Sequence, residues 1–230
     1  MNRRSILALG AATSVLVLVS SAVALAAGTK VTVSIEGRTR ALLAPTTVQT
    51  HSGSITKGGT PTGVCPATSA AGALDVATHH QWAGSYSSGL GDILLTVLLH
   101  ETYTLKSAYY WSVWVNDSYA QSGVCGVTLH RGDRLLFAVE PDNGYWYPTA
   151  LSAPSHATAG HAFKVTVRWF NAVGKSKPLA HARVHGSGVS VTTNSHGTAT
   201  ITAAHAGTLV LQADRSGYIR ATPVRVRVTG

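Results

Sequence analysis

Short segments in which apolar and polar residues alternate limit the folds open to this chain more than any other feature. Residues 30–36 (KVTVSIE) place Val31, Val33 and Ile35 on one face. Alternation with period two is typical of a strand with one buried face. A partner strand is expected at residues 38–44. Further strand-like segments occur at residues 92–98, 111–115, 134–139, 162–170, 180–185, 189–193, 198–203, 208–213 and 224–228. The pattern predicts a mainly β protein.

Helix signals are few. Residues 68–78 hold most of the closely spaced Ala, Leu and Val of the first half and form the best helix candidate. Residues 46–62 are rich in Gly, Ser and Thr, which predicts an exposed loop.

The pattern changes after the turn at residues 142–144 (DNG). Residues 149–160 are rich in Ala, Ser and Pro and are expected to form a domain junction or an edge strand. Beyond them, short strands follow at even spacing, with turns at residues 186–188, 194–197 and 215–217. This spacing is typical of a β-sandwich. We therefore expect two domains, at residues 28–148 and 149–230.

The N-terminus predicts a cleavable secretion signal at residues 1–27. Residues 2–4 (NRR) form a short basic segment of a kind that suits a bacterial signal, and residues 6–19 form an apolar run. Residues 24–26 (ALA) fit the small-residue pattern of a cleavage site. A membrane anchor is the alternative, but the apolar run is shorter than the roughly 20 residues that span a bilayer. The prediction is a secreted protein, released or loosely held at the cell surface.

Two cysteines are present, Cys65 and Cys125. In an oxidising compartment an isolated pair is most simply a disulfide. The alternative is a catalytic or metal-binding thiol. Neither cysteine lies in a C-x-x-C motif or beside a histidine, which favours the disulfide.

The chain is basic, with a formal net charge of +9, and its charges are scattered. Scattered positive charge favours weak contact with anionic surfaces over base-specific readout of nucleic acid. The expected partners are a cell-envelope polymer, a glycan or another surface protein. No nucleic-acid partner, and no integral membrane segment after signal cleavage, is expected.

The second half resembles bacterial immunoglobulin-like domains. The resemblance rests on residues 178–184 (PLAHARV), 192–199 (TTNSHGTA), 206–208 (AGT) and 216–220 (SGYIR). It implies an immunoglobulin-like β-sandwich, a fold that often serves as a spacer or binding module.

The first half resembles the DUF4430 family, which includes the C-terminal domain of transcobalamin-like carriers. The resemblance rests on residues 32–37 (TVSIEG), 82–84 (WAG), 110–116 (YWSVWVN), 123–125 (GVC) and 132–137 (GDRLLF). Asp117 stands where the family usually has Gly after Asn116, and Asp also tolerates turns. The family fold implies a β-grasp-like α+β domain with one helix on a small sheet.

Chemistry-bearing residues form no recognisable catalytic motif. The 11 histidines are scattered, and adjacent pairs such as His79 and His80 point apart on a regular element. No metal ligands, cofactor or catalytic residues are expected. A secreted hydrolase is a less favoured alternative, in which a pair of acids such as Asp92 and Glu101 would act.

Aromatic residues are the candidate ligand-binding residues. On a strand, Trp111 shares one face with Val113, whereas Tyr110 and Trp114 share the other. One interpretation places one Trp in the core and covers the other with the loop at residues 46–62. The other interpretation is an exposed aromatic platform for a sugar ring, a corrin or a partner strand. The candidate residues are Tyr110, Trp111, Trp114 and Trp82.

A second aromatic group, residues 145–147 (YWY), is expected to pack at the domain junction. Together these features predict a secreted, non-catalytic binding module. A small-ligand carrier in the manner of cobalamin-binding relatives is the alternative, and the absence of their helical barrel domain weighs against it.

Export by a bacterial host should release a protein whose first residue follows Ala26 or Ala27, because signal peptidase cleaves after small residues. N-terminal sequencing of the secreted protein checks this. Recovery of the uncleaved chain in the membrane fraction would support the anchor instead.

Overall fold

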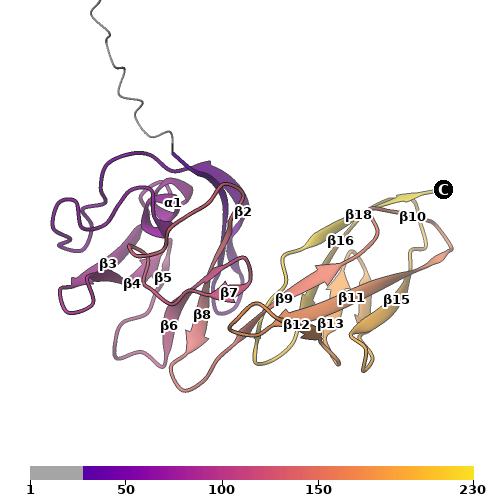
Figure 1. Ribbon diagram of the computed structural model, residues 1–230. Helices are drawn as coiled ribbons and strands as arrows, with labels where there is room; N and C mark the ends of the chain where they lie inside the picture. Colours follow the sequence, from indigo (N-terminus) through magenta and orange to yellow (C-terminus); the bar gives the residue numbers. More distant parts are fainter. Residues whose placement is uncertain (1–27) are drawn as a thin grey trace, which may run out of the picture.

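The computed structural model describes residues 28–230, and within them the protein is mainly β. The predicted signal lies outside the described residues. Figure 1 shows two groups of sheets side by side, which we name the N-terminal half (residues 28–146) and the C-terminal half (residues 147–230). Among the described residues, no helix has the length and apolarity needed to cross a bilayer.

The N-terminal half contains one helix and eight strands. They are β1 (Lys30–Glu36), β2 (Ala41–Gln49), α1 (Ala70–Ala77), β3 (Trp82–Ser87), β4 (Asp92–Leu98), β5 (Glu101–Thr102), β6 (Tyr109–Val115), β7 (Ser118–Tyr119) and β8 (Arg134–Pro141).

The C-terminal half contains ten strands. They are β9 (Tyr147–Ser152), β10 (His156–Thr158), β11 (Ala162–Phe170), β12 (Ser176–Pro178), β13 (Arg183–Gly186), β14 (Val189–Thr192), β15 (Thr198–Thr202), β16 (Gly207–Asp214), β17 (Tyr218–Ile219) and β18 (Val224–Thr229).

A five-stranded sheet of order β2-β1-β8-β6-β7 forms the centre of the N-terminal half. β1 and β8 are parallel, whereas β1–β2 and β6–β8 are antiparallel. Val31, Val33 and Ile35 are all buried, as the period-two pattern of β1 predicts. They pack in one core with α1 and with the separate sheet β3-β4-β5.

The predicted helix is confirmed. It covers Ala70–Ala77, with Ser69 as its N-cap and Thr78 as its C-cap. Every residue of α1 except Val76 is buried, so core packing compensates for its short length.

The hairpin between β6 and β7 turns on Asn116 and Asp117, whose φ angles are 50° and 68°. A two-residue loop with both φ angles positive matches the twist of the strands, and Asn and Asp tolerate that conformation. Asn116 and Asp117 therefore form the hairpin turn without a glycine.

The C-terminal half packs two sheets on one core. One sheet has the order β10-β18-β16-β13-β14, and the other has the order β12-β11-β9-β17 with β15 paired to β11. Their shared core includes Val165, Val167, Val184, Leu211 and Val226. A mainly β protein with a sandwich of sheets agrees with the prediction. The immunoglobulin-like and β-grasp types, and the boundary between residues 148 and 149, stay predictions.

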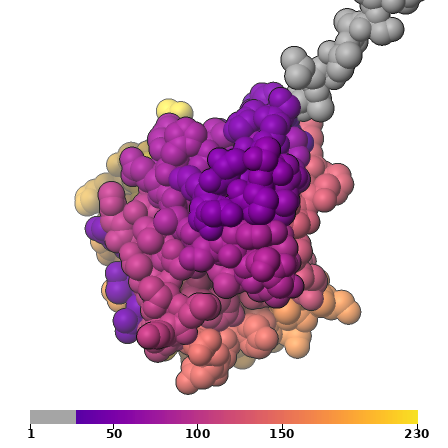
Figure 2. All heavy atoms as spheres, turned by 90° about the vertical axis from the view of Figure 1, so that its left-hand side faces the viewer, coloured from indigo at the N-terminus to yellow at the C-terminus, as the bar shows by residue number. Residues whose placement is uncertain are grey.

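The edge of the first hairpin differs from the prediction. β2 begins at Ala41 instead of residue 38 and continues to Gln49, into the segment predicted as a loop. Gly37 N–H donates to the Arg40 carbonyl, so residues 38–40 form a tight bend. Further along this segment, Gly58 contacts β3, where Tyr86 N–H donates to the Gly58 carbonyl. Figure 2 shows this indigo segment on the end of the molecule that the N-terminal half forms.

An aromatic cluster joins the two halves. Trp114 is fully buried, and it packs with Ala138 and with Ile219 of the C-terminal half. The rings of Tyr119 and Tyr147 lie edge-on to Trp114, with centroids 5.2 and 6.3 Å away. Trp146 and Tyr147 lie in this contact as expected, whereas Tyr145 is exposed.

A buried carboxylate supports this cluster. Glu140 is fully buried, and its Oε1 accepts a hydrogen bond of 2.9 Å from Trp114 Nε1. Its Oε2 lies 3.4 Å from the Tyr110 hydroxyl that donates to it. Burial raises the pKa of Glu140, and hydrogen bonds from Ser112 and Trp114 offset part of that rise.

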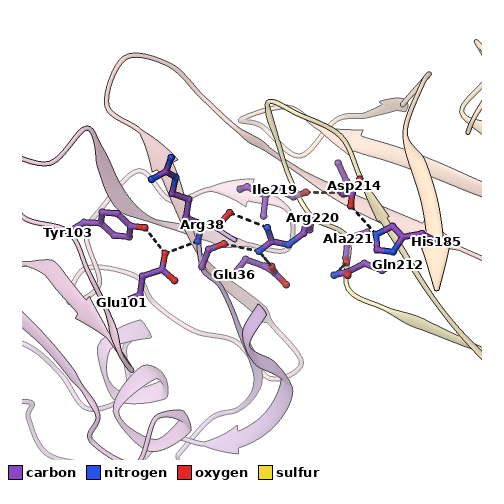
Figure 3. Close-up of polar contacts among 12 residues, drawn as sticks. Glu36, Arg38, Glu101, Tyr103, His185, Gln212, Asp214, Ile219, Arg220 and Ala221 are labelled. Carbon is purple, nitrogen blue, oxygen red and sulfur yellow. Dashed lines mark hydrogen bonds and ion pairs between the residues drawn. The ribbon is translucent and has the colours of Figure 1, made fainter. Parts of the chain in front are cut away.

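Arg220 makes a polar contact across the same junction (Figure 3). Its Nη2 donates to Glu36 Oε2 and to the Gly37 carbonyl, both at 2.8 Å, and its Nη1 donates to the Arg38 carbonyl at 3.2 Å. Burial raises the pKa of Glu36, and the charge of Arg220 counteracts this. An ion pair and two carbonyl contacts thus join β1 and its following bend to the C-terminal half.

The predicted disulfide between Cys65 and Cys125 is present. It links the segment before α1 to the loop before β8, and both cysteines are buried. Asp92 accepts hydrogen bonds from Cys125 N–H at 2.9 Å and Gly126 N–H at 3.2 Å. The start of β4 therefore supports the loop that carries Cys125.

Replacing Cys65 and Cys125 with Ser should lower the free energy of unfolding by about 4 kcal/mol, because the bond closes a loop with a separation of 60 residues. Urea denaturation monitored by tryptophan fluorescence measures the loss. An unchanged denaturation midpoint would contradict a stabilising role for this bond.

Replacing Glu140 with Gln should stabilise the protein at about pH 8. The pKa of Glu140 is higher in the folded state than in the unfolded state. The stabilisation that protonated Glu140 gives the folded state is therefore fully present below the unfolded pKa of about 4.3, and it is lost as pH rises through the folded pKa. Gln keeps an acceptor for Trp114 Nε1 and stays neutral. Melting temperatures of both proteins from about pH 4.5 to 8 should diverge as pH rises, and parallel curves would contradict the prediction.

Candidate functional site

The structure buries three of the four aromatic residues proposed for ligand binding. Trp114 is fully buried, Trp82 is 4% exposed and Trp111 is 7% exposed. The interpretation of an exposed aromatic platform is therefore wrong for these three residues. The interpretation that the loop at residues 46–62 covers the second Trp of β6 is also wrong, because the C-terminal half and Tyr119 cover Trp114.

Trp82 instead fastens α1 to β3. Its Nε1 donates to Asp75 Oδ1 at 2.7 Å. Lys57 Nζ lies 3.5 Å from the same carboxylate oxygen and 4.9 Å from the Trp82 ring centroid. His80 Nδ1 lies 2.6 Å from Asp75 Oδ2. These contacts enclose the Trp82 side chain, which therefore has a structural role.

Tyr110 and Trp111 have a different position, because both line a cavity of about 420 Å³ in the N-terminal half. We name it the aromatic cavity. β4 and the start of β6 form two of its sides, and the segment between β5 and β6 forms another. Its lining residues are Leu94, Leu95, Thr96, Tyr103, Thr104, Leu105, Ser107, Tyr109, Tyr110, Trp111 and Asp142.

The Tyr103 ring contacts two other rings of the cavity wall. The Tyr103 ring centroid lies 5.6 Å from that of Trp111 and 6.0 Å from that of Tyr109. The Arg38 guanidinium lies 4.4 Å from the Tyr109 ring centroid, on the outer side of this wall. Leu105 is 87% exposed, at the tip of the segment between β5 and β6. Mutual ring contacts hold the wall in place while the segment above it stays accessible.

Glu101 anchors this wall to the first hairpin. Its Oε1 accepts a hydrogen bond from the Tyr103 hydroxyl and another, of 2.7 Å, from Arg38 N–H. Burial raises the pKa of Tyr103, and the hydrogen bond to Glu101 adds to the rise. Burial also raises the pKa of Tyr110, with further contributions from Tyr119 and Glu140. Both phenols are therefore neutral at physiological pH.

Trp111 has an unusual polar atom. Its side chain is 7% exposed, and its Nε1 is buried without a hydrogen-bond acceptor among the described residues. A buried N–H without an acceptor costs about 1–3 kcal/mol.

Tyr103 and Tyr109 line the cavity but are not among the predicted site residues. A sequence pattern could have pointed to them. Residues 103–109 (YTLKSAY) place two Tyr at the ends of a short segment that lacks strand periodicity. An exposed Leu in the middle of such a segment also marks a surface loop with apolar character.

The two acids proposed for a hydrolase hold different loops. Asp92 accepts from Ile93, Cys125 and Gly126 N–H, whereas Glu101 accepts from Arg38 N–H and Tyr103. Neither lines the aromatic cavity, whose lining includes a single acid, Asp142. Across residues 28–230, no three His, Cys, Asp or Glu side chains gather as a set that could hold a metal ion.

Comparisons with known proteins give little similarity. No family model matches the chain, and no curated protein matches it. A solved structure of a proposed metal-binding protein from Ruminococcus gnavus is 12% identical, with a TM-score of 0.35, and the match covers 51% of this chain and 99% of that chain. Similarity at this level supports no conclusion about fold or function. The resemblances to DUF4430 and to immunoglobulin-like domains stay predictions.

Proposed function

We propose that this protein is a secreted, non-catalytic binding module that holds a neutral sugar ring in the aromatic cavity. The observation that carries the proposal is the wall of Tyr103, Tyr109 and Trp111 around about 420 Å³. Small-ligand pockets of roughly 300–1,000 Å³ are typically apolar, with a few polar groups that set orientation.

The composition of the cavity favours a neutral ligand with both apolar and polar edges. Leu94 and Leu95 add apolar surface to the rings. Thr96, Ser107 and Asp142 add hydroxyl and carboxylate groups. No Lys or Arg lines the cavity, so an anionic ligand would lack a counter-charge there. A sugar ring has C–H faces for aromatic rings and hydroxyl edges for these polar groups.

Binding is better supported than hydrolysis. Glycoside hydrolysis ordinarily needs two carboxyl groups on either side of the scissile bond. Asp142 is the one carboxylate among the residues that line the cavity. The proposal also includes secretion, a loose association with the cell envelope, and membership of the DUF4430 and immunoglobulin-like groups. The disulfide and the basic charge support an extracellular location near anionic polymers.

The test is a binding screen of the mature protein against uncharged oligosaccharides derived from chitin and cellulose, followed by calorimetry. Tyr103→Ala should weaken the binding found by about tenfold, because it removes the ring that contacts both other rings of the wall. Tyr103→Phe keeps the ring and should retain most of the affinity.

Tyr145→Ala is the matched control, because Tyr145 is an exposed Tyr outside the lining of the cavity. Its affinity should stay within about twofold of the wild-type value. Absence of binding to every oligosaccharide, or equal losses for Tyr103→Ala and Tyr145→Ala, would refute the proposal.

A further inference from the structure

A second hollow lies at the junction of the two halves, on the other side of Arg38 from Glu101. It has a volume of about 280 Å³, and its lining includes Arg38, Arg215, Arg220, Trp146 and Tyr218. We name it the basic pocket. Three arginines from two distant parts of the chain line it, together with two aromatic residues.

Arg220 is the fixed member of this group (Figure 3). Three of its five N–H groups are used, on Glu36 Oε2 and on the carbonyls of Gly37 and Arg38. These contacts hold the guanidinium plane in one orientation and leave two N–H groups for another acceptor. The side chain is 19% exposed, so solvent still reaches it.

Arg38 and Arg215 are held in place without being neutralised. Among residues 28–230, neither forms an ion pair with a carboxylate. Arg38 lies over the Tyr109 ring. Arg215 lies 5.5 Å from the Tyr218 ring centroid and donates to the Ala180 carbonyl at 2.7 Å. Contacts with rings and carbonyls restrict the two side chains of this lining but do not neutralise their positive charge.

The acids around the pocket are already engaged. Asp214 lines the pocket, and His185 Nε2 lies 2.9 Å from its Oδ2. Glu36 is 6% exposed and pairs with Arg220. With three guanidinium groups and two carboxylates, the pocket and its immediate neighbours have a surplus of positive charge.

A turn completes the pocket. Tyr218 N–H donates to the Arg215 carbonyl, and Gly217 has a φ of +80°. A positive φ at the third position is typical of a type II turn and favours Gly. Ser216 and Gly217 line the pocket and are exposed, so their N–H groups and the Ser216 hydroxyl are accessible donors.

We propose that the basic pocket binds a phosphate group. Guanidinium planes match phosphate oxygens with paired hydrogen bonds, and three planes suit an anion with oxygens on several sides. A carboxylate has only two oxygens and one charge, and it would leave more donors unpaired. The proposal is independent of sugar binding, because the aromatic cavity has no cationic lining residue.

Free phosphate and the phosphodiester of an anionic polymer share this chemistry. Calorimetry of the mature protein with inorganic phosphate and with synthetic poly(glycerol phosphate), each at constant ionic strength, separates the two sources. A free-phosphate site binds the inorganic ion as tightly as each phosphate of the polymer. A polymer site binds the polymer more tightly, and either result supports phosphate recognition.

The combined variant Arg38→Gln with Arg215→Gln should lower phosphate affinity by at least about tenfold, because hydrogen bonds to a charged partner are lost. The matched control is Arg225→Gln with Arg227→Gln, which removes the same charge from two exposed residues of β18 outside the pocket. The control should keep its affinity within about threefold.

Circular dichroism and melting temperature confirm that both double variants are folded. A single Arg215→Gln variant, which leaves the contact between Arg38 and Tyr109 intact, should show part of the loss. Equal losses in the pocket and control variants, or no phosphate binding by the wild-type protein, would overturn the proposal.

Discussion

The burial of Trp114 between the two halves is the interaction on which the arrangement of the molecule depends. β6 has a core on each face, with Trp111 in the core of the N-terminal half and Trp114 in the cluster shared with Ile219. A small sheet packs one of its faces on the core of its own domain, so an apolar residue on its other face needs a second layer to cover it. The C-terminal half, together with Tyr119, Trp146 and Tyr147, provides it.

The buried indole N–H of Trp114 also needs a hydrogen-bond acceptor, and Glu140 supplies it. The Trp114 indole N–H is deep in the junction, and an unpaired N–H there would be costly. Glu140 accepts from it but is itself fully buried, so burial raises its pKa. The junction is therefore held by apolar area and by hydrogen bonds to Glu140, which offset part of the effect of burial on its pKa.

The bend at residues 37–40 connects this junction to both proposed sites. Its main chain accepts from Arg220 and donates to Glu101, so the bend is fixed from two sides. The Arg38 side chain contacts Tyr109 of the aromatic cavity and also lines the basic pocket. A single short segment thus positions one wall of a neutral cavity and one cation of a basic pocket.

The sequence alone determined the mainly β class, the helix at residues 70–77, the hairpin at Asn116 and Asp117, and the disulfide. Each depends on a local signal: the period of apolar residues, the turn preference of Asn and Asp, or an isolated pair of cysteines. Such signals act over a few residues, or leave only one pairing possible.

Only the tertiary structure decided which aromatic residues are accessible. Trp111 and Trp114 look alike in sequence, on opposite faces of one strand. Trp111 packs in the core of the N-terminal half, whereas the docking of a segment over 100 residues later buries Trp114. The aromatic cavity joins Tyr103 to Trp111 and Leu94, and the basic pocket joins Arg38 to Arg215 and Arg220. Long-range packing creates these neighbours, and no periodicity along the chain encodes which distant surface will cover a given face.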